Sequence, residues 1–220
     1  MGRKVNERPS DLTAEERWAD TIESRAAPVV QGLPVLVDAL NTVGGWDRGF
    51  YCSVGRLPTP FLDAPLREFS RFANFSKPWL LVTAAVALTG GERGRRAAVM
   101  GLAAVAATSF VVNQPMKLIG DRTRPDREAL GVPKSRWVKM PATRSFPSGH
   151  SASAAAFAVV MGQQLPRLRL PLGLAAGVVA FSRVYTGVHY PGDVVGGVVA
   201  GSLVGRVTLS TFHRRHQVTA

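Results

Sequence analysis

Apolar residues are concentrated in five segments from residue 78 onward, whereas the first 75 residues are mostly polar and charged. The segments run over about residues 78–91, 96–114, 150–165, 170–186 and 192–209. Apolar side chains would cover nearly the whole circumference of a helix formed by each segment, which is typical of helices that are buried or surrounded by lipid. The pattern therefore predicts five helices, although most segments are shorter than the roughly 20 residues that cross a bilayer comfortably.

Residues in and around these segments favour a membrane over a soluble bundle. Arginines flank them, at positions 93, 95, 96, 167, 169, 214 and 215, as is common where helices leave the lipid. Small residues recur at every fourth position, as Gly197-Gly201-Gly205 and Gly192-Gly196-Ala200, and this spacing lets helices approach closely in lipid. We therefore expect an all-α protein, a polytopic membrane helix bundle of about five spans with a polar, partly helical N-terminal extension. The same small-residue faces would also allow a homo-oligomer.

The residues before the first segment predict shorter elements. Residues 13–16 have the spacing of a helix-capping box, so an amphipathic helix could follow them. Residues 27–43 are apolar but interrupted by a proline and polar residues, and we expect an interfacial or packed helix there. Residues 57–66 are rich in proline and are expected to be a connection. We divide the chain into an N-terminal extension of amphipathic or interfacial helices (1–60), a helix-bundle domain (61–212) and a basic tail (213–220).

The net charge is strongly positive, +12 at pH 7, from 27 lysines and arginines against 15 aspartates and glutamates. The basic residues are scattered and lack the interleaved aromatic residues of a nucleic-acid-binding face, so we expect no nucleic-acid partner. Their positions beside apolar segments suit an anionic membrane surface and contact with membrane lipids. Cys52 is the single cysteine of the chain, which excludes an intramolecular disulfide. The polar N-terminus lacks the apolar core of a signal peptide.

Three cations lie where a phosphate could be bound. Lys117 ends the second apolar segment, and an ionisable group at membrane depth is costly unless it has a function. Arg124 and Arg183 each offer a guanidinium fork that matches two phosphate oxygens. The alternatives are a lysine that extends to the interface and arginines in surface ion pairs. Arg122 and Arg127 fit the surface description, and we leave them out of the site.

The sequence Pro147-Ser148-Gly149-His150 opens the third apolar segment. Ser148 can cap the helix, and the free N–H groups of its first turn can bind phosphate oxygens, to which Gly149 allows a close approach. An imidazole titrates near neutral pH, so His150 is a candidate general acid for a departing alkoxide. A plain N-cap and a surface histidine are the alternatives.

His189 and Asp193 have the spacing of a nucleophile and the carboxylate that orients it. Pro191 suits the first position of a helix, which places Asp193 in the first turn. The carboxylate can accept the Nδ1–H of His189 and leave Nε2 free to attack phosphorus, as in a catalytic triad. A carboxylate at a helix start is also favourable by itself, but that alternative leaves His189 without a role.

Together the three segments resemble the signature motifs of the type 2 phosphatidic acid phosphatase family, which shares its site with the vanadium haloperoxidases. The pattern is K-x6-RP, PSGH and SR-x5-H-x3-D, and every defined position is matched between Lys117 and Asp193. The resemblance extends over about residues 70–210 and implies the roles given above. Because the cations and the helix N–H groups supply the charge stabilisation that a metal would give, we expect no metal and no other cofactor.

We therefore expect a membrane phosphatase that hydrolyses a lipid phosphate monoester or diphosphate through a phosphohistidine intermediate. The substrate would be phosphatidic acid, a polyprenyl phosphate or a lipid-linked sugar phosphate. The alternatives are a phosphoryl or head-group transferase, a vanadate-dependent haloperoxidase, and a non-catalytic basic membrane scaffold.

The expected location is the cell membrane, which the chain crosses several times. Five spans from residue 78 place the motif loops on the side of residues 60–77, and the charged N-terminus favours the cytoplasmic face for that side. A sixth span near residues 27–50 would turn the site outward. The basic segment 120–146 is expected to form a lid or rim over the site.

Overall fold

The computed structural model describes residues 34–117 and 122–218. The predicted helix after residues 13–16 lies outside these ranges, as does the beginning of segment 27–43. The chain divides into two compact units, Met1–Phe50 and Tyr51–Ala220, and α2 (Pro34–Gly55) contains the boundary. The predicted division into residues 1–60, 61–212 and 213–220 stays a prediction.

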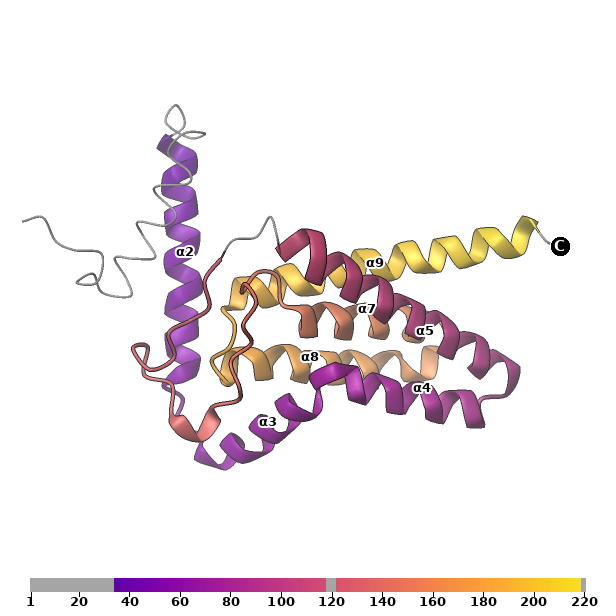
Figure 1. The fold of residues 1–220 in the computed structure, drawn as a ribbon, viewed down its shortest axis with the longest axis horizontal. Helices are drawn as coiled ribbons and strands as arrows, with labels where there is room; N and C mark the ends of the chain where they lie inside the picture. The colour runs from indigo at the N-terminus through magenta and orange to yellow at the C-terminus, as the bar shows by residue number, and fades with distance from the viewer. Residues whose placement is uncertain (1–33, 118–121, 219–220) are drawn as a thin grey trace, which may run out of the picture. The chain divides into compact units, whose positions relative to one another are not determined.

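The described part of the second unit consists of helices and loops, without a strand (Figure 1). Its helices are α3 (Pro60–Phe72), α4 (Lys77–Thr89), α5 (Gly91–Val111), α7 (Gly149–Gln164), α8 (Arg169–Tyr185) and α9 (Pro191–Val218). Short helical turns lie at η1 (Asn74–Ser76), η2 (Val112–Met116), η3 (Lys134–Arg136) and η4 (Pro166–Leu168). The helices α4, α5, α7, α8 and α9 coincide with the five predicted apolar segments, which confirms the all-α bundle.

Three helical stretches among the described residues are long and apolar enough to cross a membrane. They are Gly91–Met116, Pro166–Tyr185 and Pro191–Phe212. α4 has 13 residues and α7 has 16, and both are shorter than the roughly 20 residues of a helix that crosses a bilayer. The five predicted helices are therefore present, whereas the predicted number of five spans stays a prediction.

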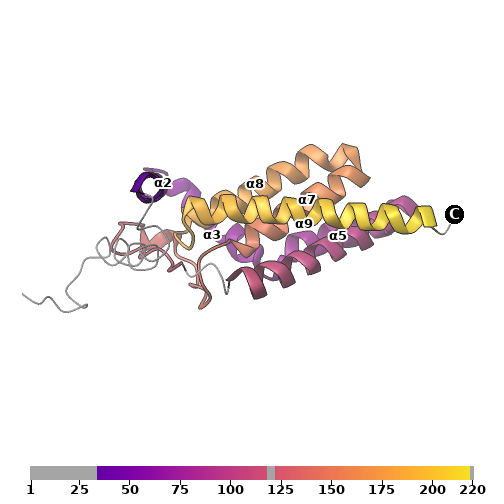
Figure 2. The ribbon, with the colours of Figure 1, turned by 90° about the horizontal axis from the view of Figure 1, so that it is seen from above.

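α7 is the central helix of the bundle. It packs against α5, α8 and α9, and α4 packs against α5 (Figures 1 and 2). Most of its side chains are buried, and Phe157 and Met161 are fully so. This enclosure explains why α7 is apolar on all sides although it is short.

The predicted small-residue stripe brings α9 against α7. A β-carbon at Gly197 would overlap the carbonyl oxygen of Ser148, and one at Gly201 would overlap that of Ala152. Glycine is therefore required at these positions, because the backbone of one helix lies where a side chain of the other would be. The stripe is occupied inside the chain, and the homo-oligomer through small-residue faces stays a prediction.

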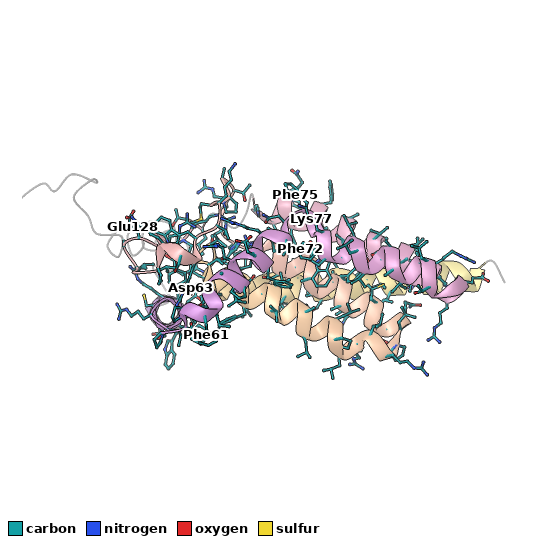
Figure 3. The ribbon with its side chains drawn as sticks, turned by 90° about the horizontal axis from the view of Figure 1, so that it is seen from below. Phe61, Asp63, Phe72, Phe75, Lys77 and Glu128 are labelled. Carbon is teal, nitrogen blue, oxygen red and sulfur yellow. The ribbon has the colours of Figure 1, made fainter. Side chains whose placement is uncertain are left out.

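The prediction that residues 57–66 form a connection is wrong, because α3 begins within them. Pro60 stands in the first turn of the helix, where its missing N–H is not needed. Pro65 lies inside α3, which normally weakens a helix. α3 turns Phe61 and Phe72 outward, 72% and 40% exposed (Figure 3), and its polar side into the protein. Contacts of that polar side compensate for the proline.

A buried ion pair joins α3 to the loop that follows the first motif. Arg136 Nε donates to Asp63 Oδ1 at 2.7 Å, and the hydroxyls of Ser135 and Tyr185 also donate to the Asp63 carboxylate. The remaining Arg136 nitrogens donate to the carbonyls of Val54, Gly55 and Leu57. Burial alone would raise the pKa of Asp63, but these hydrogen bonds and the Arg136 charge lower it. The loop is thereby anchored to α3 and α8.

Gly201→Ala should lower the thermal stability of the detergent-solubilised protein. The added methyl group overlaps the Ala152 carbonyl oxygen and must push α7 and α9 apart, and overpacking of this kind costs about 1–3 kcal/mol. Gly173→Ala in α8 is the matched control, because nothing lies within 4 Å of its new methyl group. That control should be neutral or stabilising by up to about 1 kcal/mol, since alanine favours the helix. Equal unfolding temperatures for the two variants would contradict the close packing.

Candidate active site

A cavity of about 630 Å³ lies at the end of the bundle where α7 begins. The predicted site residues that line it are Lys117, Arg124, Gly149, His150 and His189. Residues 139–143 of the loop before α7 form part of its wall, in agreement with a rim formed by segment 120–146. Residues 73–76 and Trp79, at the junction of α3 and α4, also line the cavity. The structure thus brings the three sequence motifs together around one cavity.

His189 is 2% exposed and is held from two sides. Its Nδ1 lies 3.4 Å from Asp193 Oδ2, and its Nε2 lies 3.1 Å from Arg124 Nη1. A carboxylate only accepts hydrogen bonds and a guanidinium only donates them, so these contacts fit a proton on Nδ1 and a lone pair on Nε2. Burial lowers the pKa of His189 to about 4; the hydrogen bond to Asp193 opposes the shift, and the Arg124 charge adds to it. The ring is therefore neutral at pH 7.

Asp193 is fully buried at the start of α9, in the first turn as predicted. Its Oδ2 accepts hydrogen bonds from the Ser145 hydroxyl and, at 2.9 Å, from the Tyr190 N–H. Its backbone carbonyl accepts from the Ser148 N–H at 2.9 Å. The carboxylate is thus fixed in place before any ligand arrives.

Arg122 also contacts Asp193, and its assignment to a surface ion pair is wrong. Its Nη1 lies 3.0 Å from Asp193 Oδ1, its side chain is 22% exposed, and its guanidinium lies 4.2 Å above the ring of Tyr190. Arg122 and Arg124 lie two positions apart in a non-helical segment. Side chains two positions apart share one side of an extended chain, and this spacing is the sequence signal that could have identified Arg122.

The cations of the first motif are fixed by the rim of the cavity. Arg124 Nε donates to the Thr143 carbonyl and its Nη1 to the Val188 carbonyl, each at 2.8 Å. Lys117 Nζ donates to Thr143 Oγ1 at 2.9 Å. Burial lowers the pKa of Arg124, and burial together with the Arg124 charge lowers that of Lys117. Within the described ranges, no group of three or more histidine, cysteine, aspartate or glutamate side chains is placed to hold a metal.

Arg183 lies behind the cavity wall and is 1% exposed. Its Nη1 donates to the carbonyl and the hydroxyl of Ser70 in α3, at 3.2 and 2.7 Å. Its buried Nε has no hydrogen-bond partner among the described residues. A buried donor without a partner is costly, so this N–H is available for an acceptor that the described residues do not supply.

The second motif begins α7 as predicted. Ser148 is the N-cap, and its Oγ lies 3.4 Å from the backbone nitrogen of Ser151. His150 Nε2 lies 3.0 Å from Oδ1 of Asn74, a residue that also lines the cavity. Asn74 belongs to no motif and lies between two helices, so periodicity gave no indication of its place.

Residues 98–217 match the PAP2 superfamily. The decaprenylphosphoryl-5-phosphoribose phosphatase of Mycobacterium tuberculosis (strain CDC 1551 / Oshkosh) is 36% identical over 148 residues, which are 67% of this chain and 79% of that protein. The undecaprenyl-diphosphatase BcrC of Bacillus subtilis (strain 168) is 28% identical over 131 residues, 58% of this chain and 64% of that protein.

A solved structure shares the fold. The PAP2 type phosphatidylglycerolphosphate phosphatase from Bacillus subtilis has a TM-score of 0.61 at 22% identity, covering 89% of this chain and 94% of that one. The predicted family resemblance, the membrane helix-bundle fold and the prediction of a phosphatase are confirmed by these similarities. With its three motifs gathered around one cavity and more than half of its length matched, the chain belongs to the PAP2 superfamily.

Proposed function

We propose that this protein hydrolyses a lipid phosphate, either a monoester or a diphosphate, by passing the phosphoryl group through His189. The observation that supports this most directly is that Nδ1 of His189 contacts the Asp193 carboxylate, while its Nε2 contacts the Arg124 guanidinium. Relatives named for decaprenyl- and undecaprenyl-linked phosphates support a lipid substrate. Release of inorganic phosphate by the purified protein from a panel of lipid phosphates tests the proposal.

The phosphate group would be bound by charge and by backbone donors together. Lys117 and Arg124 line the cavity, and the unpartnered Nε of Arg183 supplies a further N–H. The first turn of α7 after Ser148 adds free backbone N–H groups, and Gly149 lets a phosphate oxygen approach them. Such donors stabilise the charge on the phosphoryl oxygens as the bond to the leaving group loosens.

In the first half of the reaction, Nε2 of His189 forms a bond to phosphorus as the bond between phosphorus and the leaving oxygen breaks. His150, in its imidazolium form, gives its Nε2 proton to that oxygen and becomes neutral, so the lipid leaves as an alcohol, or as a monophosphate when the substrate is a diphosphate. Asp193 stabilises the positive charge that develops on the His189 ring.

In the second half, His150 takes a proton from water as the water oxygen bonds to phosphorus. The bond between phosphorus and Nε2 breaks, inorganic phosphate leaves, and His189 is neutral again. An alcohol in place of water would make the protein a transferase, and vanadate in place of phosphate would make the site a haloperoxidase. Release of inorganic phosphate as the main product separates hydrolysis from both of these reactions and from a non-catalytic scaffold.

The site lies at the end of the bundle where α7 begins, so its orientation depends on whether that end faces the cytoplasm. We propose that the site is cytoplasmic, in a protein that crosses the membrane several times. Arginines also lie at the opposite end, where Arg93 Nε donates to the Gln164 carbonyl at 3.1 Å and so joins the start of α5 to the end of α7. Short basic loops at that end favour the reverse orientation, and the labelling of Cys52 distinguishes the two orientations.

The His150→Ala variant should trap the phosphohistidine when the substrate is an aryl phosphate. An aryl leaving group needs little protonation, so the first half of the reaction proceeds, whereas the second half lacks its base. Radiolabelled protein that keeps its label in alkali and loses it in acid should therefore accumulate. His189→Ala should neither become labelled nor release phosphate. Labelling of His189→Ala at the level that His150→Ala reaches would exclude His189 as the nucleophile.

Arg122→Gln should lower kcat/KM by at least about 10-fold with little change in KM. The substitution removes a charged partner of the buried Asp193 carboxylate, and breaking such a pair is costly because the remaining charge stays buried. Arg122→Lys keeps the positive charge and should retain most of the activity. Steady-state kinetics of both variants measure the effect, and a wild-type rate for Arg122→Gln would remove Arg122 from the site.

Cys52 reports the orientation of the site. It is half-buried near the end of α2, and it shares the side of the motif loops if nothing crosses the membrane between residues 53 and 77. With a cytoplasmic site, a membrane-impermeant thiol reagent should label Cys52 only after the cells are permeabilised. Labelling in intact cells would overturn the cytoplasmic orientation. A cysteine introduced at Lys139, on the rim, gives the same readout if Cys52 proves unreactive.

A further inference from the structure

The chain turns sharply between α3 and α4. Phe75 (φ 56°, ψ 27°) and Ser76 (φ 58°, ψ 22°) both have left-handed backbone conformations, which residues with a β-carbon rarely adopt. Figure 3 shows Phe72, Phe75 and Lys77 at this turn, and Phe75 is 88% exposed. Two unfavourable residues in succession persist only where the surrounding structure requires them, and such places are frequent at functional sites.

Two contacts connect this turn to the site. Ser70, in the last turns of α3, accepts hydrogen bonds from Arg183 Nη1. Asn74 Oδ1 lies 3.0 Å from His150 Nε2, and the Asn74 side chain is half-buried at the cavity wall. Neither Ser70 nor Asn74 belongs to the three motifs, yet each binds a motif residue. The turn therefore acts as a fourth component of the site.

We propose that Asn74 is the positioning residue of the general acid. This inference rests on the proposed function, because it assumes that His150 protonates the leaving oxygen. An amide oxygen accepts a hydrogen bond, so its contact with Nε2 keeps a proton on that nitrogen and aims the N–H into the cavity. When substrate binds, the leaving oxygen takes the place of Asn74 Oδ1 and receives the proton. Asn74 itself neither gains nor loses a proton.

The left-handed turn explains how a residue between two helices reaches His150. A continuous helix through residues 72–77 would distribute the side chains around its circumference. The reversal at Phe75 and Ser76 instead leaves Asn74 on the cavity side while α4 starts in a new direction. The phenyl ring of Phe75 is left exposed by the same reversal.

The test compares two substrates that share the phosphate and differ in the leaving group: an alkyl lipid phosphate and an aryl phosphate. General acid catalysis matters for the alkoxide and little for the aryl oxide, and it contributes about 10²–10⁴-fold. Asn74→Ala should therefore lower kcat/KM about 10- to 100-fold for the alkyl phosphate and less than about three-fold for the aryl phosphate. Asn74→Asp keeps an acceptor oxygen and should restore kcat for the alkyl phosphate, with a raised KM because its charge repels phosphate.

Two further variants separate this role from others. Ser70→Ala removes a contact of Arg183 and should lower kcat/KM for both substrates by the same factor. Thr89→Ala, exposed at the far end of α4, should leave both rates unchanged. An equal loss for both substrates in Asn74→Ala would overturn the positioning role. If the alanine variant does not fold, a loss of kcat for the alkyl phosphate in Asn74→Asp overturns it equally.

The outcome for His150→Ala shows which proposal has failed. The comparison uses kcat/KM, which reports the first half of the reaction and not the hydrolysis of the phosphohistidine. A loss of kcat/KM in His150→Ala that is selective for the alkyl phosphate, with Asn74→Ala at the wild-type value, would overturn the inference about Asn74 and leave the proposed function intact. A loss of kcat/KM in His150→Ala that does not depend on the leaving group would overturn the role of His150 as the acid, and the inference with it.

Discussion

The site depends on the close approach of α7 and α9. Gly197 and Gly201 let the backbones of the two helices touch, and the Ser148 N–H donates to the Asp193 carbonyl at the end of that contact. The second motif begins one helix and the aspartate of the third motif lies in the first turn of the other. Packing that fixes the register of the helices therefore also fixes the distance between the start of α7, where we propose that phosphate binds, and the Asp193–His189 pair. A side chain on the stripe would move these groups apart even though it touches none of them.

Buried polar contacts, in addition to apolar packing, join α3, α8 and the loop before α7 to one another. The loop before α7 is held at Asp63 by Arg136, and α3 is held at Ser70 by Arg183. Breaking one partner of a buried pair is far more costly than leaving an exposed pair unmade. Such contacts also have a defined direction, which apolar packing lacks. They suit a wall whose side chains must point to one place, and they allow α3 to present apolar residues outward.

The sequence predicted those features that follow from periodicity or from a fixed motif spacing. Five all-round apolar segments became five helices, and the small-residue stripe became a helix contact. Pro191 predicted the start of α9 and thereby the place of Asp193 in its first turn. The prediction of a connection at residues 57–66 was wrong, because it relied on the local turn propensity of the prolines. Tertiary contacts on the polar side of α3 outweigh that propensity.

Long-range polar pairs could not be predicted in the same way. In the sequence Arg122 does not differ from other loop arginines. Only its position two residues before Arg124 indicates that the two side chains lie on the same side of the chain. Asn74 pairs with a residue 76 positions away, and no periodic pattern connects two such places. Composition also could not show that protein surrounds most of α7, since α7 is as apolar as the helices around it.

Three of the side chains to which we assign a role in the reaction are bound by another protein group in the structure. Arg124 faces Nε2 of His189, Asn74 faces Nε2 of His150, and Thr143 faces Lys117. These contacts hold the side chains in place, and they fit a proton on Nδ1 of His189 and on Nε2 of His150. In the reaction that we propose, a phosphate would replace these partners with its own oxygens and would need little rearrangement, which is the condition under which preorganised charge lowers a barrier. The Nε of Arg183 has no hydrogen-bond partner among the described residues, so under the same proposal a phosphate oxygen would be an added acceptor for it.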